Sequence, residues 1–190
     1  MQLSSRSPSP TRPAKRLKSR RFSSSSDPGR APVHVYIALG SNWGRREGFL
    51  TKARMLLEAQ GVRILNASSI YRTFPEGFRF QPSFLNQVLA AETSLSPLEL
   101  LEASKQIELR LNRIRPFPNA PRTIDIDLLF YNNVVMDTPT LTLPHPRVAE
   151  RAFVLVPLAE IAPRMRHPVL GLSVTQMLSK VDTSWVRRWR

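Results

Sequence analysis

The sequence predicts an α+β fold: a ferredoxin-like antiparallel sheet in the order β-α-β-β-α-β, with helices on its faces and a C-terminal extension. Two patterns predict this fold. Short segments with the β-branched and aromatic composition of strands alternate with longer segments whose apolar residues repeat at the helical period. The size agrees, because 190 residues of which 42% are hydrophobic can bury one core.

Strand composition is found in four segments that are bounded by turn residues, namely 33–39, 62–71, 84–93 and 123–130. The first segment runs into the turn cluster Gly40-Ser41-Asn42, and prolines predict loops at 73–82 and 116–121. After the fourth segment, Asn132-Asn133 predicts a hairpin turn into Val134-Val135. We therefore expect four main strands and one short hairpin.

Two longer segments predict helices between these strands. The first spans 49–61 and closes with a glycine that can cap its end. The second begins with Ser96 as N-cap, has proline at its first position and Glu99 completing a capping box, and fades near Arg113. A third, short helix is expected over 152–161, and the remaining residues are expected to cap the domain.

The formal net charge of +14 is concentrated at the N-terminus. Residues 1–31 hold eight Lys and Arg residues against Asp27 alone, which is about half of the excess, and they are rich in Ser and Pro. Such a segment buries too little apolar surface to offset its chain entropy. We expect residues 1–31 to be a disordered basic tail and residues 32–190 to be one domain.

Three interpretations of this tail stay open. An Arg- and Ser-rich, acid-poor N-terminus is typical of organellar transit peptides, and Lys15-Arg16-Leu17-Lys18 is typical of nuclear or nucleic-acid addresses. The third interpretation is a solvated extension from an upstream start codon, and we favour it. A secretory signal is excluded because the tail has no apolar h-region.

Composition excludes several classes of function. The chain has no cysteine, which excludes disulfides, thiol catalysis and cysteine-ligated metal centres. Its three histidines lack the spacing of a zinc motif. No apolar run reaches the ~20 residues that a membrane span needs. The basic balance predicts a polyanionic partner, either nucleic acid, nucleotide phosphate or anionic lipid.

The most informative pattern is a pair of carboxylates on the fourth strand. Side chains alternate between faces, so Asp125 and Asp127 share one face, with Cα atoms ~6.5–7 Å apart, and Ile124, Ile126 and Leu128 share the other. Two neighbouring carboxylates repel each other unless a divalent cation binds between them, and oxygen ligands suit Mg²⁺. The pair therefore indicates two-metal phosphoryl chemistry, although two solvent-facing aspartates would give the same pattern.

Arginines close to this pair favour a phosphate ligand. Arg113, Arg115 and Arg122 lie within a short stretch just before Asp125, joined by the proline-rich loop. A metal site has no need of neighbouring cations, but a triphosphate does, because its charge exceeds what two Mg²⁺ ions neutralise. A triphosphate that binds together with Mg²⁺ is therefore the expected ligand.

The stretch 120–129, Ala-Pro-Arg-Thr-Ile-Asp-Ile-Asp-Leu-Leu, closely resembles the signature of the 6-hydroxymethyl-7,8-dihydropterin pyrophosphokinases of folate biosynthesis. Seven further blocks resemble the family in the family's order, and together they cover about residues 33–163. These blocks are 38–42, 69–73, 81–86, 92–95, 107–109, 143–146 and 151–153. A lone Asp-x-Asp pair would be poor evidence, but ordered blocks around it make the match strong.

The resemblance implies transfer of the β,γ-pyrophosphoryl unit of ATP to the pterin hydroxymethyl group, leaving AMP. Asp125 and Asp127 would hold two Mg²⁺ ions and, with Arg113 and Arg122 on the closing loop, form the catalytic set. The family roles further imply that ATP is contacted by Glu108, Arg115, His145 and Arg151.

The resemblance also implies a pterin site. Phe84 and Phe153 would sandwich the ring, Asn86 would bind its amide edge, and the backbone near Thr73 would complete the contacts. Without the resemblance, both phenylalanines are expected to be plain core residues. The loop 116–121 departs from the family, because it lacks the Arg-Trp-Gly that many members carry before Pro-Arg.

A second class of function, a basic ferredoxin-like nucleic-acid-binding module, would also explain the charge. It predicts an aromatic, basic sheet face, which the sequence lacks, and it has no use for paired aspartates. We therefore expect a monofunctional, monomeric enzyme of the bacterial cytoplasm, whose partners are ATP and the pterin rather than nucleic acid or membrane.

Overall fold

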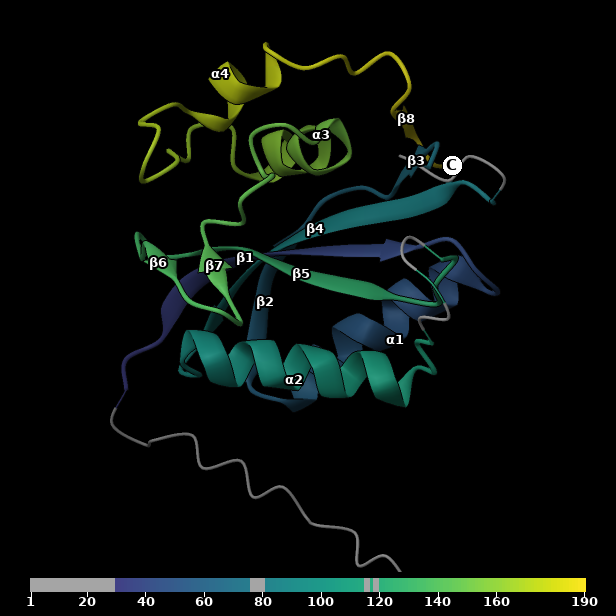
Figure 1. Ribbon diagram of the computed structural model, residues 1–190, viewed down its shortest axis with the longest axis horizontal. Coiled ribbons are helices and arrows are strands. Elements are labelled where there is room, and N and C mark those ends of the chain that lie inside the picture. Colours follow the sequence, from purple (N-terminus) through teal and green to yellow (C-terminus); the bar gives the residue numbers. More distant parts are fainter. Residues whose placement is uncertain (1–29, 76–80, 115–116, 118–119) are drawn as a thin grey trace, which may run out of the picture.

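The computed structural model describes residues 30–75, 81–114, 117 and 120–190. Most of its strands form one antiparallel sheet in the order β5-β1-β4-β3-β8, with β2 also paired to β4 (Figure 1). The strands of this sheet are β1 (Val33–Ser41), β2 (Val62–Ala67), β3 (Tyr71–Thr73), β4 (Phe84–Thr93), β5 (Asp125–Tyr131) and β8 (Arg187–Arg188). The prediction of an α+β domain with an antiparallel sheet is confirmed.

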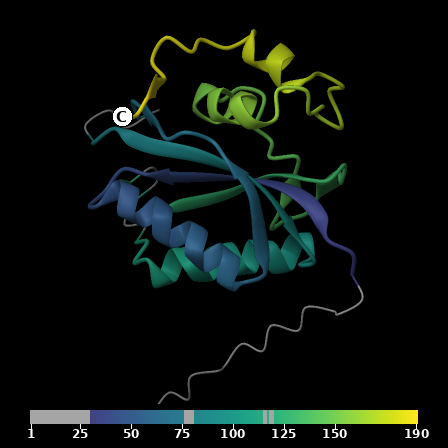
Figure 2. The same cartoon turned by 180° about the vertical axis from the view of Figure 1, so that it is seen from behind.

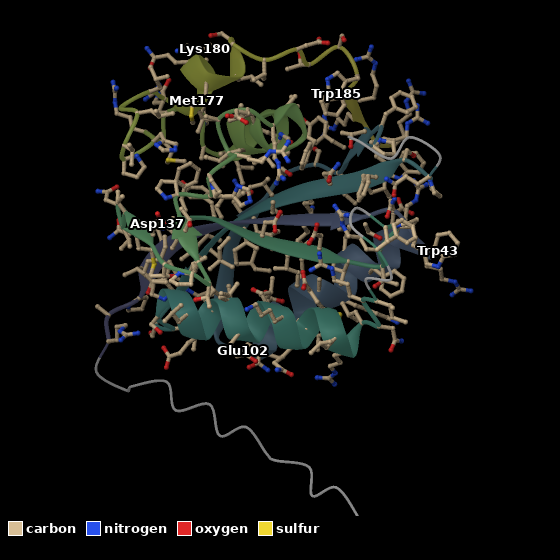
Figure 3. All side chains as sticks on the ribbon, in the orientation of Figure 1. Trp43, Glu102, Asp137, Met177, Lys180 and Trp185 are labelled. Atoms are coloured by element: carbon tan, nitrogen blue, oxygen red, sulfur yellow. The ribbon has the colours of Figure 1, made fainter. Side chains whose placement is uncertain are left out.

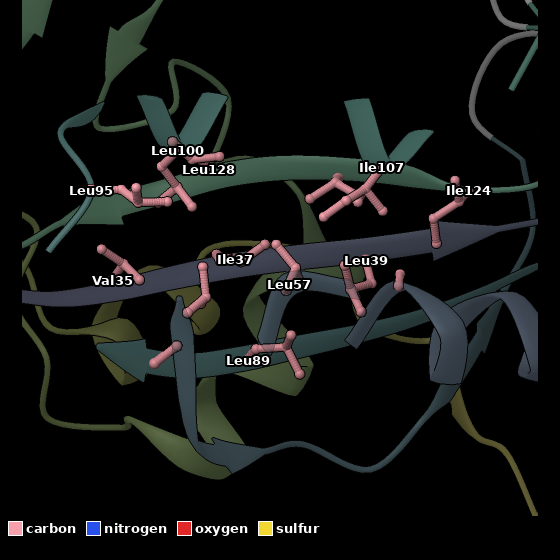
Figure 4. Packing of buried hydrophobic residues seen from close by; sticks show 14 of the residues in the cluster. Val35, Ile37, Leu39, Leu57, Leu89, Leu95, Leu100, Ile107, Ile124 and Leu128 are labelled. Carbon is pink, nitrogen blue, oxygen red and sulfur yellow. The ribbon is translucent and has the colours of Figure 1, made fainter. Parts of the chain in front are cut away.

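Helices cover both faces of this sheet. The helices α1 (Arg46–Ala59) and α2 (Pro97–Arg110) lie on one face, whereas α3 (Ala152–Ile161) and α4 (Val174–Leu178) lie on the other (Figures 1 and 2). Under α1 and α2, one apolar cluster includes Ile37, Leu57 and Leu100 (Figure 4). Under α3 and α4, a second cluster includes Phe130 and Leu155. The predicted boundaries of the third helix, 152–161, are confirmed.

The strand predicted over 62–71 is divided into two. Strand β2 pairs with the C-terminal half of β4 and β3 pairs with its first residues, with a break at 68–70. At the break, the Ser68 N–H still donates a hydrogen bond to the Val88 carbonyl, at 2.9 Å. The Gln87 side chain donates to the Ser68 carbonyl at 2.8 Å, so these polar groups are satisfied without regular pairing.

The prediction of a hairpin turn from Asn132-Asn133 into Val134-Val135 is wrong. Asn132 does form a turn with a positive φ of 47°, but residues 134–135 leave the sheet. A separate two-stranded ribbon forms further on, between β6 (Met136–Asp137) and β7 (Thr142–Leu143). The carbonyl of Leu129 on β5 accepts instead from the N–H of His145, at 2.9 Å, so this edge of β5 holds the His145 loop.

The capping box predicted for α2 is confirmed. The Ser96 hydroxyl accepts from the Glu99 N–H at 3.3 Å, and the Glu99 carboxylate accepts from the Ser96 N–H at 2.7 Å. Replacing Ser96 by alanine removes the cap and should lower the free energy of unfolding by about 1 kcal/mol. Urea unfolding checks this, with Ser184→Ala on the exposed C-terminal segment as a control, and an unchanged midpoint in Ser96→Ala would contradict it.

The N-terminal tail lies almost wholly outside the described residues, so its disorder stays a prediction. Arg30, the first described residue, forms an exposed ion pair with Glu99 at 3.4 Å. Among the described residues, none of the helices combines the length and the hydropathy that crossing a membrane requires.

Candidate active site

A cavity of about 500 Å³ lies beside the strands β1, β4 and β5, and ten of the twelve site residues predicted from the sequence line it. The ten are Thr73, Phe84, Asn86, Arg113, Arg122, Asp125, Asp127, His145, Arg151 and Phe153. Glu108 is not among the lining residues, and Arg115 lies outside the described residues. The fold thus brings side chains from distant parts of the chain to one cavity.

The two aspartates point from β5 into this cavity, opposite the buried Ile126 and Leu128, as the alternation predicted. Asp125 forms ion pairs with Arg113 and with Arg122, whose Nε lies 2.8 Å from the Asp125 carboxylate. Asp127 lies 3.7 Å from Arg151. Burial, followed by the negative charge of Asp125, raises the pKa of Asp127 to about 6. The site therefore disfavours a second negative charge unless a cation accompanies it.

Glu108 lies behind the cavity wall rather than on it. Its carboxylate accepts from the backbone N–H of Ile126 at 2.7 Å and forms an ion pair with Arg113. Burial raises the pKa of Glu108. In this conformation Glu108 holds Arg113 against Asp125 and binds the start of β5, and its contact to the nucleotide, which the resemblance implied, stays a prediction.

His145 lies between Arg147 and Arg151. Its Nδ1 accepts from the N–H of Arg147 at 3.1 Å, which favours a neutral ring with its proton on Nε2, and that Nε2 lies 3.5 Å from the Arg151 Nη1. Burial and the charge of Arg151 lower the pKa of His145 to about 4. The ring lines the cavity, so its Nε2–H can donate to a phosphate oxygen near neutral pH.

The expected pterin residues line the same cavity. The Asn86 amide donates to the Thr73 hydroxyl at 2.8 Å, and both side chains are buried. The Arg122 guanidinium lies over the Phe84 ring, 4.8 Å from the ring centroid. Gly40 permits this packing, because a Cβ there would lie 3.2 Å from the Asn86 amide oxygen. An aromatic wall beside an oriented amide suits a flat heterocycle with polar edges.

Asn42, which the sequence places in a turn cluster and in the block 38–42 of the resemblance without a role of its own, connects two loops of the site. Its side chain is fully buried, and its Oδ1 accepts from the Arg122 N–H at 2.8 Å. Its Nδ2 donates to Gln81 at 2.9 Å and to the Pro82 carbonyl at 3.2 Å. One amide thus joins the Arg122 loop to the loop before Phe84. The available signal was the place of Asn42 in the block 38–42 of the resemblance.

The donor set fits Mg²⁺ that arrives with a phosphate ligand. Among the described residues there is no cluster of three or more His, Asp or Glu side chains that could hold a metal alone. Mg²⁺ is commonly held by one or two carboxylates and completed by water and substrate phosphates, which matches Asp125 and Asp127. Since Asp125 is already paired with two arginines, a lone cation would have to compete with them.

The fold and the site together suit phosphoryl transfer between a nucleotide and a flat second substrate. Residues 36–163 match the family described as 7,8-dihydro-6-hydroxymethylpterin-pyrophosphokinase (HPPK), and the chain belongs to this family. The prediction of an ATP-dependent pyrophosphokinase of folate synthesis, made from the resemblance, is confirmed at this level.

Two curated relatives match over most of their own length. The 2-amino-4-hydroxy-6-hydroxymethyldihydropteridine pyrophosphokinase of Bacillus subtilis is 43% identical over 82% of this chain and 90% of that protein. Its namesake in Methylorubrum extorquens is 44% identical over 82% of this chain and 98% of that protein.

Longer relatives contain the match as one part. The folic acid synthesis protein fol1 of Pneumocystis carinii is 41% identical over 77% of this chain, which spans only 20% of that protein. The solved structure of Plasmodium falciparum HPPK-DHPS A437G with SDX-DHP superposes with a TM-score of 0.66 at 16% identity, covering 82% of this chain and 46% of that one. At that identity the likeness concerns the fold alone.

Proposed function

We propose that the cavity beside β5 binds ATP and 6-hydroxymethyl-7,8-dihydropterin together and transfers the pyrophosphoryl group between them. One observation carries this proposal: a single cavity joins the Asp125–Asp127 pair and its arginines to the Asn86–Thr73 amide and the phenylalanine walls. The paired carboxylates meet the requirements of a metal-bound triphosphate, and the amide between rings meets those of a pterin.

The reaction balances without a protein nucleophile. The pterin hydroxymethyl oxygen attacks the β-phosphorus of ATP, a new O–P bond forms, and the bond from that phosphorus to the α,β-bridging oxygen breaks. AMP leaves with the electron pair, and the hydroxyl proton passes to water. Such transfer depends chiefly on positioning and on charge neutralisation. Bound Mg²⁺, for which we propose two ions, would neutralise the phosphates and lower the pKa of the hydroxyl.

The chain's own residues supply the rest. Asp125 and Asp127 would hold the metal, and Arg122, Arg151 and the Nε2–H of His145 would bind the triphosphate oxygens. Arg113 would join them once phosphates compete for its pair with Asp125. Arg115 is proposed for the same role from the resemblance.

The pterin would bind between Phe84 and Phe153, both of which line the cavity. The Asn86 Nδ2 donates to Thr73, so the amide carbonyl oxygen is turned toward Gly40. That oxygen would accept from an N–H at the edge of the ring. The hydroxymethyl group would then lie toward the aspartates.

We also infer that the sheet is a ferredoxin-like core. The strand order supports this, because β5, β1, β4 and the β2–β3 pair follow one another as the fourth, first, third and second strands of a split β-α-β arrangement. Strand β8 and the β6–β7 ribbon are additions to it. The monomeric state and the cytoplasmic location stay predictions.

The test is formation of AMP from ATP, Mg²⁺ and the hydroxymethyl-dihydropterin by the purified full chain, followed by a coupled assay. We expect one AMP per pterin diphosphate and no ADP. Omitting the pterin should abolish AMP formation. A chain that releases ADP, or that forms no AMP, would contradict the proposed function.

The same assay tests the N-terminal tail. A chain without residues 1–31 should keep its turnover within about twofold, because the described residues that line the cavity begin at Ala38. Matched assays of the full and shortened chains measure this. A large loss of turnover would show that the tail takes part in the reaction.

A further inference from the structure

The last residues of the chain lie outside the family match and are folded onto the domain. The match ends at residue 163, whereas β8 pairs with β3 at the edge of the main sheet, Arg188 opposite Tyr71 and Arg187 opposite Arg72 (Figure 1). Beyond β8, the Trp189 N–H donates to the Ile70 carbonyl at 2.8 Å. The C-terminal segment 185–189 therefore lies beside β3, whose last residue, Thr73, lines the cavity.

Trp189 contacts Arg46, which binds next to one wall of the proposed pterin site. Its indole Nε1–H donates to Glu47 in the first turn of α1 at 2.5 Å. The Arg46 guanidinium lies 5.5 Å from the centre of the same ring and donates to the Ser83 carbonyl at 2.7 Å. Ser83 is the residue directly before Phe84, so the contacts run from Trp189 through Arg46 to the backbone next to Phe84.

Trp185 contacts the opposite wall. Its ring centre lies 6.5 Å from that of Phe153, with the planes tilted by 57°, and Figure 3 marks Trp185 on the α3 side of the sheet. Phe153 also carries the Arg151 guanidinium, 5.4 Å from its ring centre. Aromatic contacts of this kind contribute about 0.5–1.5 kcal/mol each, which is enough to bias the position of a half-buried ring.

We propose that the C-terminal segment 185–189 is a positioning element for the pterin, with Trp185 fixing the Phe153 wall and Trp189 fixing the Phe84 wall. This inference rests on the proposed function, since it assumes that the two rings hold the pterin. Neither tryptophan lines the cavity. The segment should therefore act more on pterin affinity than on ATP affinity, which it reaches only through the Arg122 and Arg151 guanidinium groups that rest on these two rings.

The experiment measures KM for the pterin and for ATP, and kcat, in Trp185→Ala, Trp189→Ala and the double variant. Each single change should raise the pterin KM about 3- to 10-fold, with the ATP KM within about twofold of wild type. Trp185→Phe should restore most of the pterin KM, because the ring contact returns. Arg187→Ala, an exposed residue of the same segment, is the matched control and should behave as wild type.

A double-mutant cycle separates positioning from loss of folding. Arg46→Ala should reproduce the effect of Trp189→Ala, and the two together should be no worse than one, because both interrupt the same contacts. Thermal unfolding of each variant accompanies the kinetics. A pterin KM that stays at the wild-type value in both tryptophan variants would overturn the inference, as would equal increases for ATP and pterin.

The wild-type chain distinguishes this inference from the proposed function. If wild type forms AMP and the tryptophan variants keep its pterin KM, only the positioning role fails. If wild type forms no AMP with the pterin, the proposed function fails and the positioning role fails with it.

Discussion

Asp127→Asn is expected to lower kcat by about 10²–10³-fold, the loss commonly seen when a charge-stabilising group is removed from a transfer site. Asparagine keeps the size of the side chain but cannot bring a negative charge to a metal-bound triphosphate. Asp127 points into the cavity, 3.7 Å from Arg151. The variant therefore removes the charge and leaves the packing of β5 in place.

Folding should not suffer in this variant. Burial raises the pKa of Asp127 to about 6, so the folded chain holds the proton more tightly than the unfolded one does. Ionisation of Asp127 thus lowers stability as the pH rises from about 4 to about 6, and that loss persists at pH 7. Asparagine avoids this cost, so the thermal midpoint at pH 7 should be equal or higher.

Single-turnover AMP formation at saturating Mg²⁺ measures the effect on catalysis. Asp137→Asn is the matched control, because Asp137 is an exposed aspartate of β6 that bonds Thr142 at 2.7 Å, outside the cavity lining. It should keep the wild-type rate. If Asp127→Asn also retained that rate, pyrophosphoryl transfer would not take place at this carboxylate pair.

The parts of the fold that depend on neighbours in sequence could be predicted. The alternation of β5, the capping box of α2 and the limits of α3 are local patterns, and the structure contains all three. The break in the strand predicted over 62–71 could not be predicted, because the bonds of Gln87 and Val88 to Ser68 create it. Strand β8 likewise depends on the edge of β3, which no local pattern reveals.

The candidate site follows the same division. The aspartates and arginines could be found because they cluster in sequence and because the resemblance named the others. Asn42 could not be assigned its role, since its bond to Arg122 joins residues 80 positions apart. The bond between Trp189 and Glu47 joins residues 142 positions apart. A single sequence shows the chemistry of such side chains but not which of them meet.

The contacts of Glu108 and Arg113 lead to the second large effect. Arg113 is only 8% exposed in its side chain and forms ion pairs with Glu108 and Asp125, which are themselves 10% and 17% exposed. Arg113→Ala removes the cation paired with Glu108, whereas Asp125 keeps its pair with Arg122. Breaking a buried pair in this way commonly lowers stability by about 3–5 kcal/mol. We expect a loss of that size in the free energy of unfolding, measured with urea.

Adding Glu108→Gln to Arg113→Ala should recover much of this loss. A glutamine oxygen can still accept from the Ile126 N–H, which Glu108 now binds at 2.7 Å, and it carries no charge that needs Arg113. An exposed arginine of α2, Arg110, provides the control, and Arg110→Ala should change stability by less than about 0.5 kcal/mol. A small loss in Arg113→Ala, below about 1 kcal/mol, would contradict the buried pairs.

The size of that loss also bears on how the site works. A guanidinium held between Glu108 and Asp125 can bind a triphosphate only if contacts to the phosphates and to Mg²⁺ replace the ion pairs that both carboxylates lose. Arg113→Ala should therefore cost less free energy in the binding of a non-hydrolysable ATP analogue than in the stability of the free chain. The reason is that wild type must break the pairs of Arg113 before Arg113 can bind phosphate. Calorimetric titration of both proteins measures the difference. If the variant instead lost as much binding free energy as free energy of unfolding, Arg113 would bind phosphate without giving up its ion pairs. Glu108 would then have no positioning role.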